Sequence, residues 1–199
     1  MYHFFETIKI IDGFPVNLEY HQKRMNYTFN SKFGANIPPV LKDIINVPEQ
    51  YKSGLVKCKV EYNSHQYHAI FSNYVPKTVD SLKIVYDDSI IYDFKYVDRS
   101  ELQRLLIKKG DCDEILIVKQ RRITDTSYSN IAFFDGDRWY TPDSPLLPGT
   151  ARTRLLETGL ISATHINMQN IRDFKSFILI NSMLDIDFSN MKPVSSIHE

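Results

Sequence analysis

A short segment near residue 150 has the residue types of an anion-binding site. Gly149, Thr150 and Ala151 follow a proline and precede an arginine-rich stretch with the pattern of a helix. The first N–H groups of a helix have no partner within the helix and carry partial positive charge, so a phosphate group can bind there. The same residues are also typical of a plain turn with a helix cap, and both interpretations stay open at this point.

A second candidate for anion binding is Arg24, because the planar guanidinium group suits phosphate. A helix is expected from about 18 to 29, beginning after Asn17. His21, Arg24 and Thr28 recur at helical spacing and therefore share one face of it. An ordinary surface arginine is the alternative.

Lys57 and Lys59 are candidates for contact with a substrate carboxylate. They alternate with apolar residues in the stretch 55–62, which predicts a strand with both lysines on one face. A basic face of a sheet is most often only solvated, so this pattern indicates a substrate site less strongly than Arg24 indicates a phosphate site.

Composition argues against several classes of protein. The 199 residues include 24 basic and 24 acidic side chains, so bulk charge provides no attraction to nucleic acid or to an anionic membrane. Cys58 and Cys112 lie far apart without metal-ligand spacing, so neither a disulfide framework nor a metal site is expected. Without a long apolar run or a signal peptide, the chain is expected to be cytoplasmic.

Hydrophobic periodicity and turn residues predict an α+β chain in two lobes, residues 1–76 and 77–199. The first lobe contains a hairpin, the helix 18–29 and a second hairpin over 55–74. For the second lobe, the pattern predicts strands at 82–86, 89–94, 115–118 and 177–180, a helix that begins near Asp98 or Ser100 and ends at Gly110, and a helix-like piece at 165–175.

Several segments, in their order and spacing, resemble the class IV aminotransferase family, the fold-type IV pyridoxal-phosphate enzymes. This family includes branched-chain and D-amino acid aminotransferases and 4-amino-4-deoxychorismate lyase. The matching segments are Phe5-Glu6-Thr7 for F-E-T, His21 to Arg24 for H-x-x-R, Lys95 to Arg99 for the K-x-x-N-R of the lyase branch, Asp125 with Asn130 for E-x-x-x-x-N, Thr141-Pro142 for T-P, Leu147 to Arg152 for L-x-G-[IV]-T-R, and Asn181-Ser182-Met183 for N-S-L.

The resemblance implies a role for each matched residue. Lys95 is the expected Schiff-base lysine for pyridoxal 5'-phosphate and then moves the substrate α-proton. Asp125, with Asn130, is expected beside the pyridine nitrogen, where a carboxylate keeps that nitrogen protonated. The residues expected to bind the phosphate are Arg24, Thr150, Ala151 and Ser182.

The resemblance also implies the fold-type IV architecture, with a small N-terminal α/β lobe and a larger C-terminal pseudo-barrel lobe. Met1 stands only a few residues before Phe5, so the small lobe is expected to lack the first strand of the family. Asp125 replaces the usual Glu and is one methylene shorter. A homodimer acting on a small amino-acid-like molecule is expected.

Three activities are compatible with this resemblance. The leading one is a lyase similar to 4-amino-4-deoxychorismate lyase, favoured by Asp98-Arg99 after the lysine and by the late Asn181-Ser182-Met183. A branched-chain or D-amino acid aminotransferase is the second, and it needs a carboxylate trap. The candidates for that trap are Lys57, Lys59 and Arg99. The third is a binding or partner subunit without chemistry of its own.

Overall fold

The computed structural model describes residues 3–34, 36–184 and 186–199, in two compact units. Unit 1 comprises Met1–Pro76 and Phe94–Asp98, and unit 2 comprises Lys77–Asp93 and Arg99–Glu199. The predicted lobe 77–199 included Phe94–Asp98. In the structure this segment belongs to unit 1, where Tyr96 forms a β-bridge with Phe4 of the first strand. Every helix in the described residues is too short or too polar to cross a membrane.

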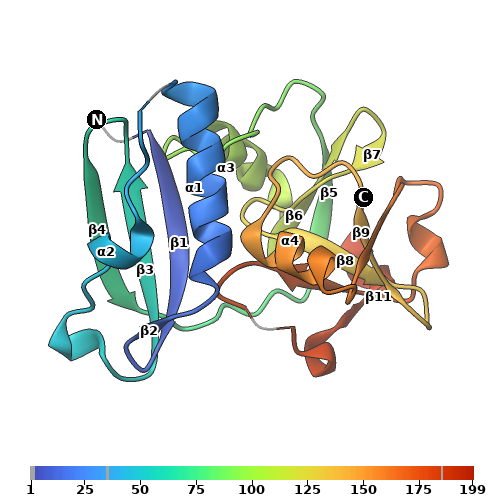
Figure 1. Ribbon diagram of the computed structural model, residues 1–199. Helices are drawn as coiled ribbons and strands as arrows, with labels where there is room; N and C mark the ends of the chain where they lie inside the picture. The colour runs from blue at the N-terminus through green and yellow to red at the C-terminus, as the bar shows by residue number, and fades with distance from the viewer. Residues whose placement is uncertain (1–2, 35, 185) are drawn as a thin grey trace. The chain divides into compact units, whose positions relative to one another are not determined.

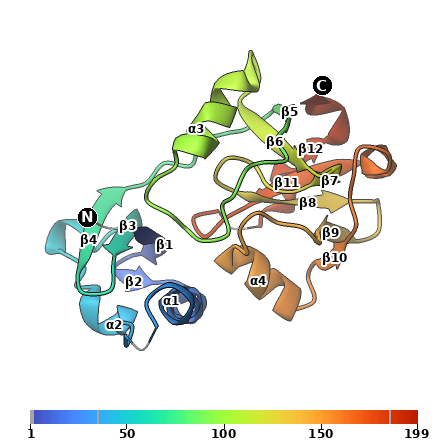
Figure 2. The same cartoon turned by 90° about the horizontal axis from the view of Figure 1, so that it is seen from above.

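Unit 1 is a four-stranded antiparallel sheet with one long helix on one face (Figure 1, Figure 2). The strand order is β2-β1-β3-β4. The elements are β1 Phe4–Ile11, β2 Phe14–Pro15, α1 Leu18–Lys32, α2 Leu41–Ile44, the 3-10 turn Glu49–Tyr51, β3 Leu55–Tyr62 and β4 Tyr67–Asn73.

Alternation along β1 and β3 gives the sheet of unit 1 two different faces. Ile8 and Ile10 pair with Cys58 and Val56, and these side chains pack with α1 in an apolar core. The predicted strand 55–62 is confirmed, and α1 continues three residues past the predicted end at 29. The opposite face carries the lysines of β3, because successive side chains point to opposite sides.

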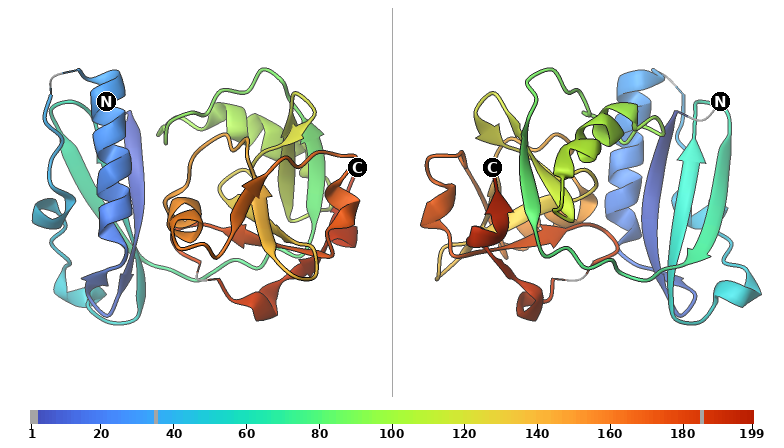
Figure 3. Two further views of the ribbon diagram at one scale, coloured as in Figure 1. Left: turned by 45° about the vertical axis from the view of Figure 1, so that its right-hand side comes forward. Right: turned by 180° about the vertical axis from the view of Figure 1, so that it is seen from behind.

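Unit 2 contains two sheets that share one apolar interior (Figure 3). The strand orders are β10-β9-β8-β11-β12 and β13-β5-β6-β7. The strands are β5 Leu82–Tyr86, β6 Glu114–Lys119, β7 Arg122–Ile123, β8 Asn130–Phe134, β9 Trp139–Pro142, β10 Ser162–Thr164, β11 Ser176–Ile180, β12 Lys192–Pro193 and β13 Ile197–His198. Leu116 and Val118 of one sheet belong to the same core cluster as Ile131 and Phe133 of the other.

The described residues of unit 2 include two short α-helices, α3 Ser100–Leu106 and α4 Thr150–Glu157. The N-cap of α3 is Arg99, so the predicted capping by Asp98 or Ser100 is wrong. The remaining 3-10 turns are Ile107–Lys109, Ile171–Asp173, Phe188–Asn190 and Val194–Ser196.

Two predicted elements of unit 2 are replaced by turns. Residues 89–94 form no strand, because the Asp87 carboxylate accepts hydrogen bonds from the backbone of Ser89 and Ile90 and bends the chain. The predicted helix-like piece 165–175 contains only a 3-10 turn, since Asn167 and Asn170 bond to nearby backbone groups and compete with helix formation.

Candidate active site

Lys95 lies beside β1 in unit 1, with its amine against an aromatic ring. The carbonyl of Lys95 accepts a hydrogen bond of 2.9 Å from the backbone N–H of Phe5. Its Nζ lies 4.8 Å from the centroid of the buried Phe5 ring, and the Nζ of Lys59 lies 4.9 Å from the same centroid. A ring face attracts an ammonium group, so both amines lie where the Phe5 ring can attract them.

Lys59 also contacts an acid on its own strand. Its Nζ lies 2.5 Å from Glu61 Oε1, and its side chain is about one-third exposed. Lys57 lies two residues before Lys59 on β3 and on the same face of the sheet, as the alternation predicted. The structure therefore brings Lys59 and Lys95 to one ring and places Lys57 farther along the strand.

Arg24 pairs with an acid from β1. Both oxygens of the Glu6 carboxylate accept hydrogen bonds from Arg24, from Nε at 2.9 Å and from Nη2 at 2.5 Å. His21 Nδ1 lies 2.6 Å from Glu6 Oε2. Sequence reasoning did not identify Glu6 as a site residue, although an acid within the apolar face of a strand was a visible signal.

The electrostatics of this cluster follow from its burial. Burial alone raises the pKa of Glu6, but the charge of Arg24 and the hydrogen bonds from His21 and Arg24 outweigh it and lower this pKa from 4.5 to about 2. The pKa of His21 is lowered, first because burial disfavours its charged form. An ionised carboxylate only accepts, so Nδ1 of the neutral His21 carries the hydrogen and donates a hydrogen bond to Glu6.

In unit 2, Asp125 is buried and held by neutral groups. Asn130 Nδ2 donates to Oδ1 at 2.7 Å, and the backbone N–H of Leu147 donates to Oδ2 at 3.0 Å. Burial raises the pKa of Asp125 to about 6, even though these hydrogen bonds and the charge of Arg152 lower it. A protonated nitrogen beside this carboxylate would favour its ionised form again.

The start of α4 is built around Gly149. This residue is the N-cap, and because glycine has no side chain it provides no capping hydrogen bond of its own. A Cβ on Gly149 would lie 2.0 Å from Asn130 Oδ1, so only glycine fits beside Asn130. Arg152 anchors the first turn by donating to the carbonyl of Pro142 at 2.9 Å. Thr150 and Ala151 are thus presented at an N-terminus whose N–H groups suit an anion.

Ser182 and Arg99 lie in two further hydrogen-bonded segments of unit 2. Ser182 follows Asn181, whose side chain donates to Ser129 Oγ at 2.9 Å and accepts from the backbone N–H of Met183. Arg99 Nη2 donates to the carbonyl of Ser127 at 2.5 Å. Within the described residues, Arg99 Nε is buried without a hydrogen-bond partner. Arg99 thus contacts the loop after Asp125.

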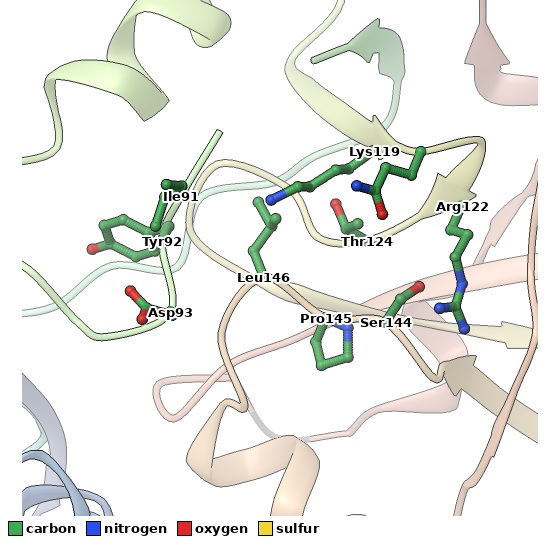
Figure 4. Close-up of a pocket in the computed structure, with 10 residues that line it drawn as sticks. Ile91, Tyr92, Asp93, Lys119, Arg122, Thr124, Ser144, Pro145 and Leu146 are labelled. Carbon is green, nitrogen blue, oxygen red and sulfur yellow. The ribbon is translucent and has the colours of Figure 1, made fainter. Parts of the chain in front are cut away.

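A separate pocket of about 230 Å³ lies in unit 2 (Figure 4). Residues from 91–93, 119–124 and 144–146 line it. Its two basic side chains already have partners, since Lys119 donates to the carbonyl of Ile90 and Arg122 donates to Asp143. The predicted site residues, each of which is described, lie outside this lining.

Comparison with known proteins agrees with the arrangement of these motifs. The model of the amino-transferase class IV family matches residues 3–197. The chain belongs to this family. It is 35% identical over 185 residues to an uncharacterized protein of Haemophilus influenzae, covering 92% of this chain and 98% of that protein.

Two solved structures extend the comparison. A "putative 4-amino-4-deoxychorismate lyase" from Haemophilus somnus is 34% identical with a TM-score of 0.87, over 94% of this chain and 98% of that one. A "hypothetical aminotransferase" from Mycobacterium tuberculosis in a PLP-bound form is 14% identical with a TM-score of 0.73, over 98% of this chain and 81% of that one, and shows the fold alone.

The expected fold-type IV architecture is confirmed by the Haemophilus somnus neighbour, whose chain is matched almost throughout. As a member of the class IV family, the chain is an enzyme of that class. The roles expected for its individual residues stay predictions.

Proposed function

We propose that the protein is a pyridoxal-phosphate-dependent lyase that converts 4-amino-4-deoxychorismate to 4-aminobenzoate and pyruvate, a reaction of folate biosynthesis. The observation that carries this proposal is the 34% identity, over 94% of the chain, to a protein named as such a lyase. The segment from Lys95 to Arg99, which resembles the lyase branch of the family, supports it.

Two features of unit 2 fit the cofactor. The buried carboxylate of Asp125 suits a protonated pyridine nitrogen, and the N-terminus of α4 suits a phosphate group. When bound, pyridoxal phosphate supplies an electron sink for the electron pair left after proton removal. Cofactor binding in the fold neighbour from Mycobacterium tuberculosis agrees with this assignment.

Lys95 is proposed as the catalytic residue. Its amine would hold the cofactor through the aldehyde carbon and, once the substrate amine has taken its place there, Nζ would remove the proton from the ring carbon that bears that amine. With this proton removed, cleavage of the bond between the ring carbon and the enolpyruvyl oxygen would leave an aromatic ring and release enolpyruvate, which becomes pyruvate when its methylene carbon takes up a proton. We propose that the Phe5 ring, whose centroid lies 4.8 Å from Nζ, helps to position this amine for the transfer.

Four residues are proposed to bind the phosphate, and Asn130 is proposed to hold Asp125 in place beside the ring nitrogen. These four are Arg24, Thr150, Ala151 and Ser182. Lys59 is the best placed of the three candidates for binding the substrate carboxylate, because its amine and the amine of Lys95 both contact the Phe5 ring. Lys57 and Arg99 are weaker candidates. We further propose a homodimer, as the family resemblance implies.

The proposal is tested by supplying purified protein and pyridoxal phosphate with 4-amino-4-deoxychorismate, without any oxo acid. We expect pyruvate and 4-aminobenzoate in equal amounts, and a loss of at least about 10³-fold in Lys95→Ala, because a positioned proton-transfer group contributes about that much. Parallel reactions contain D-alanine or L-leucine with 2-oxoglutarate. A strict requirement for the oxo acid would reject the lyase and favour the aminotransferase.

A further inference from the structure

The buried carboxylate of Glu6 has no role in the proposed reaction, although it is the centre of a cluster in unit 1. Glu6 is fully buried on the face of β1 that packs against α1, between apolar neighbours. A buried ion pair often stabilises a fold no better than well-packed apolar residues would. The acid at this position therefore calls for an explanation other than core packing.

The contacts of Glu6 fix the direction of one side chain. Arg24 bonds to both carboxylate oxygens through Nε and Nη2, which is the two-pronged geometry that sets the plane of a guanidinium group. His21 donates to Oε2 from the same helix, one turn before Arg24. The Glu6 carboxylate thus accepts a hydrogen bond from His21 and at the same time fixes the orientation of Arg24.

An arginine oriented in advance binds an anion more tightly than a mobile one. A free arginine side chain loses many rotamers when it binds, and a side chain already fixed by Glu6 has lost them during folding. The lowered pKa of His21, caused first by burial, leaves its ring neutral at pH 7. The cluster of Glu6, His21 and Arg24 then carries no net charge, so it owes its effect to geometry rather than to excess positive charge.

We propose that Glu6 and His21 are positioning residues that orient Arg24 toward the phosphate group of the cofactor. This inference rests on the proposed function, since it assumes that pyridoxal phosphate is the ligand. It separates two roles within one cluster: Arg24 contacts the phosphate, and the other two residues act only through Arg24.

The test compares binding of pyridoxal phosphate and of pyridoxal, which lacks the phosphate, by equilibrium dialysis against the same protein samples. The change in the ratio of the two dissociation constants from one variant to another reports the phosphate contribution, because the internal hemiacetal of free pyridoxal is the same in every sample. For Glu6→Gln we expect an affinity for pyridoxal phosphate about tenfold lower and an affinity for pyridoxal changed by less than about twofold. His21→Gln, which keeps a donor, is expected to lower the first affinity about threefold.

Two further variants complete the experiment. Arg24→Met should remove most of the preference for the phosphorylated ligand, and adding Glu6→Gln to it should change the ratio no further, because no guanidinium is left to orient. Glu61→Gln is the matched control, since Glu61 pairs with Lys59 on the neighbouring strand. It should leave the ratio at the wild-type value.

The outcomes separate this inference from the proposed function. Equal losses for both ligands in Glu6→Gln would show a merely structural role and overturn the inference. A preference that is lost in Arg24→Met but kept in Glu6→Gln and His21→Gln would overturn it as well, and would leave the proposed function standing. Failure of the wild-type protein to bind either ligand would instead reject the proposed function, and the inference with it.

Discussion

At the scale of single residues, the environment of Asp125 makes its ionisation costly. Both oxygens accept hydrogen bonds, from Asn130 and Leu147, yet burial still raises the pKa to about 6. An aspartate in place of the glutamate of the family pattern therefore does not make the carboxylate an easily ionised surface group. It remains suited to pairing with a cationic ring nitrogen.

This environment predicts a pH dependence for the cofactor-free protein. A carboxyl group whose pKa rises from 3.8 to about 6 on folding contributes stability that is present below pH 3.8 and is lost as pH rises to about 6. The loss amounts to about 3 kcal/mol at 1.36 kcal/mol per unit. We expect urea unfolding of Asp125→Asn to lack this fall between pH 4 and 6.

Comparison with the wild type at each pH is essential, because Glu6 changes stability in the opposite direction. The lowered pKa of Glu6 contributes stability above about pH 4.5 that is lost toward pH 2. Parallel stability curves for wild type and Asp125→Asn between pH 4 and 6 would contradict the account of Asp125.

At the scale of elements, the start of α4 depends on a close approach between two chain segments. Gly149 has a backbone conformation open to any residue, with φ −67° and ψ 145°, so the requirement for glycine comes from Asn130 and not from the backbone. The family pattern identified this glycine. Only the structure shows that the glycine is required because the Asn130 side chain lies against it.

We therefore expect Gly149→Ala to destabilise the fold by about 1–3 kcal/mol, because the added methyl group overlaps Asn130 Oδ1. Chemical denaturation measures this change. The matched control is the double variant with Asn130→Ala, in which the overlapping atom is gone. If Gly149→Ala costs as much in the Asn130→Ala background as in the wild type, the cause is not this contact.

At the scale of the whole molecule, sequence reasoning succeeded where the pattern was local and repeated. Strong alternation predicted the strand 55–62, and helical spacing placed His21 and Arg24 on one face, where both now contact Glu6. The expected strand 89–94 is absent from the described chain, because the Asp87 side chain bonds to backbone groups two and three residues ahead.

Hydrophobic periodicity could not predict contacts between residues that are distant in the sequence. The pairing of Glu6 with Arg24 requires a known strand-to-helix packing, and the two lysines at Phe5 require the position of the segment Phe94–Asp98. The motif order indicated which residues matter, while the packing shows which of them act together.

Chemical trapping of the cofactor shows directly whether Lys95 carries pyridoxal phosphate. The protein is incubated with the cofactor, reduced with borohydride to fix the bond to the amine, digested and analysed by mass spectrometry. We expect the added mass on the peptide that contains Lys95, with a visible absorption band before reduction, and neither in Lys95→Ala. Label on Lys57 or Lys59 instead, or no band with the wild-type protein, would contradict the account.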